Sequence, residues 1–177
     1  MSKNKTQKQK MTKDVVPEGF TLSLALTDAI PVLFFGASMV AVSFLFSSRL
    51  FLFGALLCLI AGAAKVLWKI IVVLKKKNIW ALFIQMRILM PIGLLIMIIA
   101  VILKKSAVDF SGILSAALSF PPVIFFGSGI LGMVLKTVFA FSLDSSSAKA
   151  NFTEQLTNGI AQACFFTGLV LVLLNMR

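Results

Sequence analysis

The sequence predicts an all-α fold, a polytopic membrane bundle of about five transmembrane helices. From about residue 20 onward, four long and almost uncharged apolar runs and a fifth, more polar run fill the chain. Each run reaches the roughly 20 residues that a helix needs to cross a ~30 Å hydrocarbon layer. The composition agrees, because 59% of the residues are hydrophobic and 13% are charged, whereas ordinary soluble domains carry about 25% charged residues.

Residues 1–19 differ from the rest of the chain, because they are polar and contain five lysines. We expect them to form a disordered, basic tail in the cytosol. The apolar run that follows is too long for a cleaved signal peptide. Residues 20–177 then form a single transmembrane domain, since the connections between runs are too short to fold independently. The net charge of +11 therefore predicts membrane orientation rather than nucleic-acid binding.

Each predicted span ends where polar residues return. The first follows the tail and ends at the Ser-Ser-Arg sequence of residues 47–49, and the second ends at the lysines of residues 75–77. Lys104 and Lys105 end the third, and the serine-rich segment of residues 142–147 ends the fourth. The predicted spans are residues 20–47, 50–74, 79–103, 108–143 and 152–174.

The fourth run is longer than one crossing needs, and it contains Pro121 and Pro122. Two interpretations remain open, because proline ends or kinks a helix. The run is either one tilted helix kinked at the prolines, or a short re-entrant or interfacial segment before a span that begins near Pro122. A sixth crossing is excluded, because a helix of residues 108–119 would be only about 18 Å long.

Lys and Arg concentrate on one side of the predicted bundle. The tail and the loop of residues 75–77 hold eight lysines, whereas the other side holds Arg49, Lys104, Lys105 and Arg177. We expect the chain to lie in the cell (cytoplasmic) membrane. The positive-inside rule then places the N-terminus on its cytosolic side and the C-terminus on its external side.

Several kinds of chemistry lack their usual residues. The chain has no histidine, which argues against imidazole catalysis, histidine-ligated haem and most zinc sites. Cys58 and Cys164 lie inside apolar runs, without the spacing of a metal site. We therefore expect no catalytic residue, no metal and no cofactor, and a protein that is not an enzyme.

Charged residues inside the spans need a reason, because each costs at least ~2.5 kcal/mol at the bilayer centre. Asp28, Lys65 and Arg87 all lie roughly 12 to 14 Å from the cytosolic face at a rise of ~1.5 Å per residue. We therefore expect Asp28 within salt-bridge reach of Lys65 or Arg87. Pro31 and Pro91 follow two of these charges, and we expect them to interrupt their helices. More polar residues reach the same level, namely Lys69, Gln85, Lys136, Gln155, Asn158 and Gln162.

Two functional interpretations follow from this polar layer. The charges either hold helices together, or they line a cytosol-facing cavity that favours an anionic group. The interpretation as a cavity predicts a small membrane transport protein, or the substrate-binding membrane subunit of a transporter. Its substrate-binding residues would be Asp28, Lys65, Arg87, Asn158 and Gln162. The alternative is a non-catalytic structural or assembly subunit of a larger membrane complex. Candidate partners are membrane lipids, an anionic small molecule, and a second copy or another membrane subunit, but not nucleic acid.

Overall fold

The computed structural model describes residues 21–143 and 148–176. Every regular element in these two ranges is a helix. The predicted tail of residues 1–19 lies outside the described residues. The helices are α1 (Leu22–Leu45), α2 (Arg49–Lys75), α3 (Trp80–Ile84), α4 (Met86–Lys104), α5 (Phe110–Leu118), α6 (Pro122–Ser142) and α7 (Ala148–Asn175).

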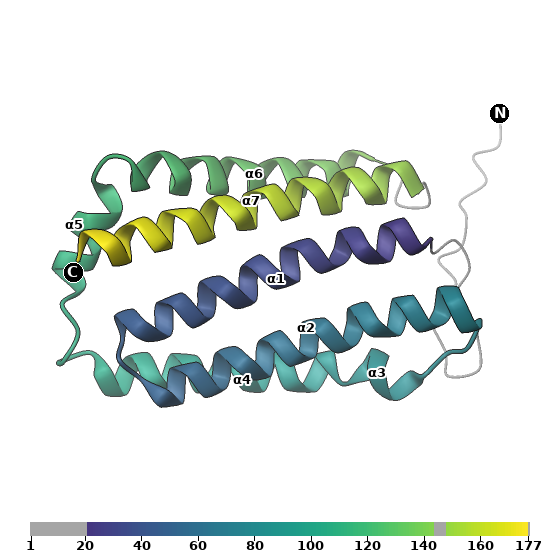
Figure 1. Cartoon of the computed structure of the whole chain (residues 1–177), viewed down its shortest axis with the longest axis horizontal. Coiled ribbons are helices and arrows are strands. Elements are labelled where there is room, and N and C mark those ends of the chain that lie inside the picture. Colours follow the sequence, from purple (N-terminus) through teal and green to yellow (C-terminus); the bar gives the residue numbers. More distant parts are fainter. Residues whose placement is uncertain (1–20, 144–147, 177) are drawn as a thin grey trace.

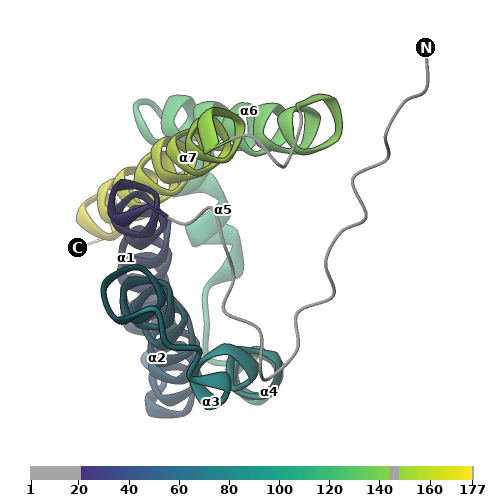
Figure 2. The same cartoon turned by 90° about the vertical axis from the view of Figure 1, so that its right-hand side faces the viewer.

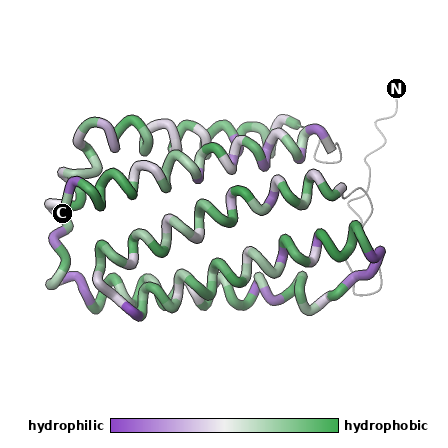
Figure 3. Tube along the Cα trace, in the orientation of Figure 1, coloured by the Kyte–Doolittle hydropathy of each residue, from purple (hydrophilic) through white to green (hydrophobic). Residues whose placement is uncertain are grey.

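Five helices are long and apolar enough to cross a membrane, which confirms the predicted fold class. They are α1, α2, α6, α7 and the bent helix Trp80–Lys104, which comprises α3 and α4. Hydrophobic residues dominate along their length, and many hydrophilic residues gather toward their ends (Figure 3). Short connections join them, so that consecutive spans run in opposite directions (Figure 1).

The helix ends are defined by local capping. The hydroxyl of Thr21 accepts a hydrogen bond from the Leu24 N–H at the start of α1, and Ser48 does the same for Phe51 at the start of α2. These contacts satisfy backbone donors that a helix cannot satisfy itself. At the end of α2, Lys76 adopts a left-handed conformation (φ 49°), which stops the helix within the lysines of residues 75–77. We call the end of the bundle that carries these lysines the lysine end.

The spans form an open arch rather than a closed bundle. Their order around the arch is α6, α7, α1, α2, α4, and each touches only its neighbours in that order. Figure 2 shows the arch end-on, with α4 and α6 at its two ends and α5 between them. Among the described residues, no Cα atom of α4 comes within 8 Å of one of α6. The concave side of the arch is therefore open between α4 and α6.

Small and aromatic residues set the spacing between neighbouring helices. A Cβ atom on Gly132 of α6 would lie 2.8 Å from the Cβ of Ala161 on α7, so these helices approach closely, as small residues permit. Helix α7 also packs Phe165 against Phe126 of α6 and Phe166 against Phe34 of α1. It is thus held on both sides.

The fourth run consists of two helices. Helix α5 ends at Leu118, Ser119 is extended, and α6 begins at Pro122. The interpretation as a short segment followed by a span is therefore confirmed, and the single kinked helix is wrong. The two prolines explain the break, because neither has an N–H that could continue the hydrogen bonds of α5. The ring of Phe110 in α5 packs 5.8 Å from that of Phe46, at the end of the bundle opposite the lysine end.

Candidate functional site

A pocket of about 360 Å³ lies inside the arch near the lysine end. All five spans contribute to it, including α4 and α6, which do not touch each other. The pocket is therefore bounded by the concave face of the arch. Its polar lining residues are Asp28, Lys65, Lys69, Lys136, Gln155, Asn158 and Gln162.

Four of the five residues predicted to bind substrate line this pocket, namely Asp28, Lys65, Asn158 and Gln162. They come from α1, α2 and α7, so residues more than 130 positions apart in the chain meet here. The fifth, Arg87, does not line the pocket. That the four bind a substrate stays a prediction.

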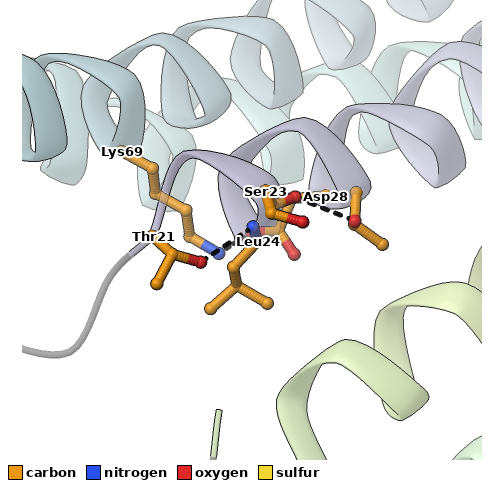
Figure 4. Close-up of polar contacts among 6 residues, drawn as sticks. Thr21, Ser23, Leu24, Asp28 and Lys69 are labelled. Atoms are coloured by element: carbon orange, nitrogen blue, oxygen red, sulfur yellow. Dashed lines mark hydrogen bonds and ion pairs between the residues drawn. The ribbon is translucent and has the colours of Figure 1, made fainter. Parts of the chain in front are cut away.

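Asp28 forms its ion pair with Lys69, not with Lys65 or Arg87 as the sequence suggested. Its Oδ2 pairs with the Lys69 Nζ across the contact between α1 and α2 (Figure 4). Within residues 21–143 and 148–176, no ion pair joins Asp28 to either predicted partner. The predicted partner Lys65 lies one turn of α2 away from the observed partner Lys69. The two lysines share one helix face, so the packing of α1 decides which of them contacts Asp28.

Arg87 is exposed and does not line the pocket. Its guanidinium lies 5.3 Å from the centre of the Phe83 ring. This is a cation–π contact within the same bent span, between α4 and α3. The residues of α4 that line the pocket are Met86 and Met90. Arg87 lies only three residues from Met90, so its spacing along α4 alone does not exclude it from the pocket. The packing of α4 brings the two methionines, and not Arg87, to the pocket lining. The position of Arg87 within the third span was predictable, but its absence from the pocket lining was not.

The predicted helix breaks at Pro31 and Pro91 are also wrong. Helices α1 and α4 continue through both prolines, and the only break within the third span is at Gln85. The Gln85 Nε2 donates to the Leu82 carbonyl at 3.2 Å and to the Ala61 carbonyl of α2 at 2.9 Å. A side chain that takes over a carbonyl of its own helix is a known cause of a bend. Gln85 therefore bends the span and ties it to α2.

Cations outnumber carboxylates in the pocket by three to one. Asp28 is 8% exposed and is already paired with Lys69. Lys65 and Lys136 are half-buried, and neither has an ion pair in the part of the chain that the structure describes. Lys136 lies on α6, across the pocket from Lys65 on α2. Two positive charges thus line a shared space, and neither is paired with a carboxylate of the described ranges.

Neutral polar groups add to the site from α7. Within residues 21–143 and 148–176, the buried amide oxygen of Asn158 and one carboxylate oxygen of Asp28 have no hydrogen-bond partner. Gln162 donates only a long contact of 3.8 Å to the Met133 sulfur. Buried polar atoms are nearly always satisfied in folded proteins, so these groups have hydrogen-bonding capacity left for water or a ligand.

The apolar part of the pocket lining was not predicted from the sequence. Met86 and Met90 of α4 and Met133 of α6 line the pocket beside the lysines. The spacing of Met86 and Met90 places them on one helix face, but methionine is equally common in lipid-facing and core positions. Only the position of α4 relative to α2 shows that this face is turned inward.

No protein-family model matches the chain, and neither a curated protein nor a solved structure is significantly similar to it. Within residues 21–143 and 148–176, no three His, Cys, Asp or Glu residues are grouped so that they could hold a metal ion. We therefore infer the function from the pocket.

Proposed function

We propose that this chain is a small membrane transport protein, or the substrate-binding membrane subunit of a transporter, whose pocket binds an anionic group such as a phosphate or carboxylate. The observation that supports it is the convergence of Lys65, Lys69 and Lys136 on one pocket with a single carboxylate. The proposal includes no catalytic step.

The energetics favour a ligand over a purely structural role for these lysines. A lysine near a membrane surface can extend its ammonium to the headgroups, but these three line a common space inside the arch. Asp28 balances Lys69, whereas no carboxylate of the described residues forms an ion pair with Lys65 or Lys136. Unpaired charges away from bulk water are unfavourable, and a bound anion offsets this penalty.

The location of the pocket supports access from the cytosol. It lies near the lysine end, where the positive-inside rule predicts the cytosolic face. We therefore expect the chain in the cytoplasmic membrane, with its N-terminus in the cytosol and its C-terminus outside. Substrate would then enter or leave the pocket on the cytosolic side.

The proposal is tested by measuring the binding of radiolabelled acetate and inorganic phosphate to the purified protein in lipid nanodiscs. Lys65→Met and Lys136→Met should each weaken binding by roughly 10- to 100-fold, because a charge-assisted hydrogen bond contributes about 1.5 to 3 kcal/mol. Arg87→Met is the matched control, because it removes a cation at similar depth that does not line the pocket. Equal losses in all three variants, or no saturable binding to the unchanged protein, would contradict the proposal.

The open side of the arch favours one alternative function. Among the described residues, no Cα atom of α4 comes within 8 Å of one of α6, and only the short helix α5, at the end opposite the lysine end, lies between them. A helix of another subunit or of a second copy could therefore complete the bundle. The chain would then be a structural or assembly subunit. Cysteine cross-linking from α4 and α6 in native membranes distinguishes the two functions: a cross-linked protein together with absent anion binding supports the alternative.

A further inference from the structure

A second pocket, of about 320 Å³, lies between α1, α2 and α4. Every residue that lines it is apolar, namely Met39, Phe51, Leu94, Met97, Ile98, Val101 and Ile102. It contains no group that could bind a charge. Its own lining therefore suits a hydrocarbon.

The two pockets lie in series along the same faces of their helices. On α2, Lys65 and Cys58 line the first pocket and Phe51 lines the second, at intervals of seven residues. On α4, Met90 lines the first and Met97 the second, again seven residues apart. Seven residues make nearly two full turns, so these side chains point the same way. The lysines are at one end of this row and the apolar pocket is at the other.

Flexible side chains separate the two pockets. Phe35 and Met90 line the first, Met39 and Met97 line the second, and all four belong to one packed cluster. Five of the eight methionines in the chain line one pocket or the other: Met39, Met86, Met90, Met97 and Met133. Methionine side chains adapt to irregular ligands. The partition can therefore rearrange around a chain that passes from one pocket to the other.

The second pocket is also accessible from the bilayer. Leu94, Ile98 and Ile102 line it and are 43%, 57% and 58% exposed. Helix α4 has no contact with α6 in the described ranges, so an amphiphile has an open side to pass through. A ligand that is already in the membrane would not have to cross water to reach the site.

We infer that the ligand is a membrane-borne acyl anion, a long hydrocarbon chain with a carboxylate or phosphate head. The head lies among Lys65, Lys69 and Lys136, and the chain extends into the apolar pocket. From Lys65 to Phe51 is 14 residues of α2, about 21 Å. The hydrocarbon of one leaflet, which is as thick as its acyl chains are long, measures ~15 Å. The row is longer than this, so a long acyl chain fits along it. The inference rests on the proposed function and specifies the class of its ligand.

Photo-labelling tests this inference in the full-length protein in phosphatidylcholine nanodiscs. The probes are a long-chain fatty acid and a phosphatidic acid, each with a diazirine near the methyl end of an acyl chain, and labelled residues are mapped by mass spectrometry. At least one probe should label residues of the apolar pocket. Lys65→Met should reduce that labelling at least fivefold, and Arg87→Met should leave it unchanged. Competition by the unlabelled form of each probe identifies the preferred head.

A second pair of variants tests the acyl pocket itself. Ile98→Trp should fill the pocket and reduce labelling of Phe51 and Met97, whereas Ile99→Trp should not, because Ile99 is also exposed on α4 but does not line the pocket. Labelling spread evenly over the lipid-facing surface, or equal in both tryptophan variants, overturns the inference. If acetate or phosphate binds in a Lys65-dependent way without acyl labelling, the inference fails and the proposed function stands. If neither binds, both fail.

Discussion

Gly54 of α2 and Gly93 of α4 lie directly against each other. A Cβ atom built on either glycine would lie 2.7 Å from the carbonyl oxygen of the other. No real Cβ approaches backbone so closely, so the two helices are in backbone contact at this point. Cys58 and Met97, which pack beside the glycines, belong to the core cluster between α2 and α4.

Gly54→Ala should therefore destabilise the protein by about 1 to 3 kcal/mol, because the added methyl group forces the helices apart. Gly127→Ala is the matched control, since no atom lies within 4 Å of the place that the added methyl group would occupy on α6. It should be neutral or slightly stabilising, because alanine favours helix over glycine. Reversible unfolding in mixed detergent micelles measures both. Equal effects of the two variants would show that this helix contact is looser than described.

The Asp28–Lys69 pair should show strong coupling between its partners. The two side chains are 9% and 15% exposed, so removing one partner leaves a charge in a poorly hydrated place. Asp28→Asn and Lys69→Met should each destabilise the fold by about 3 kcal/mol, and the double variant by clearly less than the sum. Additive losses in the unfolding free energy would mean that the pair contributes no coupling.

The orientation of the chain is testable by cysteine accessibility. In a variant without Cys58 and Cys164, Lys77→Cys should be protected from an impermeant thiol reagent in intact cells, and Lys105→Cys should react. Both positions are exposed in the structure and lie at opposite ends of the bundle. Permeabilised cells provide the control, because both cysteines should react there. The reverse pattern in intact cells contradicts the proposed orientation.

Asp109 caps α5 outside the spans, and its cap should depend on pH. Its carboxylate accepts hydrogen bonds from the Gly112 N–H at 2.9 Å and the Ser111 hydroxyl at 2.8 Å. These bonds hold the pKa of Asp109 below its ordinary value. A lowered folded-state pKa means that the cap is fully formed above the ordinary value and is lost as the pH falls through the lowered one.

The amide NMR signal of Gly112 should report this titration. Its midpoint is expected below that of an exposed aspartate, and Asp109→Asn should keep the cap while abolishing the pH dependence. Asp109→Ala should lose the cap at every pH. A midpoint at or above the ordinary aspartate value would contradict the hydrogen-bonded geometry.

Properties that depend on position along a helix were predictable from the sequence. The length of each apolar run predicted five spans, and the spacing of charges predicted that Asp28 and Lys65 lie at similar depth. Properties that depend on rotation about a helix were not. Whether Arg87 lines the pocket depends on how its helix packs against the others, and the hydrogen bond from Gln85 to the Ala61 carbonyl of α2 is part of that packing. No periodicity within one run carries this information.

The partner of Asp28 was unpredictable for the same reason. Lys65 and Lys69 lie on one face of α2, and only the packing of α1 decides which of them reaches the carboxylate. The apolar pocket was unpredictable as well, because Met39 and Met97 resemble any lipid-facing residue in the sequence. What distinguishes them is that both line the same apolar pocket, from α1 and from α4.

The order of helices in the arch has a consequence for biosynthesis. Helix α1 is made before the other six described helices, yet it lies between α2 and α7, which is made after them. Until α7 has been inserted, α1 is packed against α2 alone and α6 has no neighbouring span, because α7 connects α6 to the rest of the arch. A ribosome that stops before residue 148 therefore releases α1, α2 and α4 as one group, with α6 attached only through the segment that contains α5. Of the five described spans, the one made after the others is the one that unites the two parts.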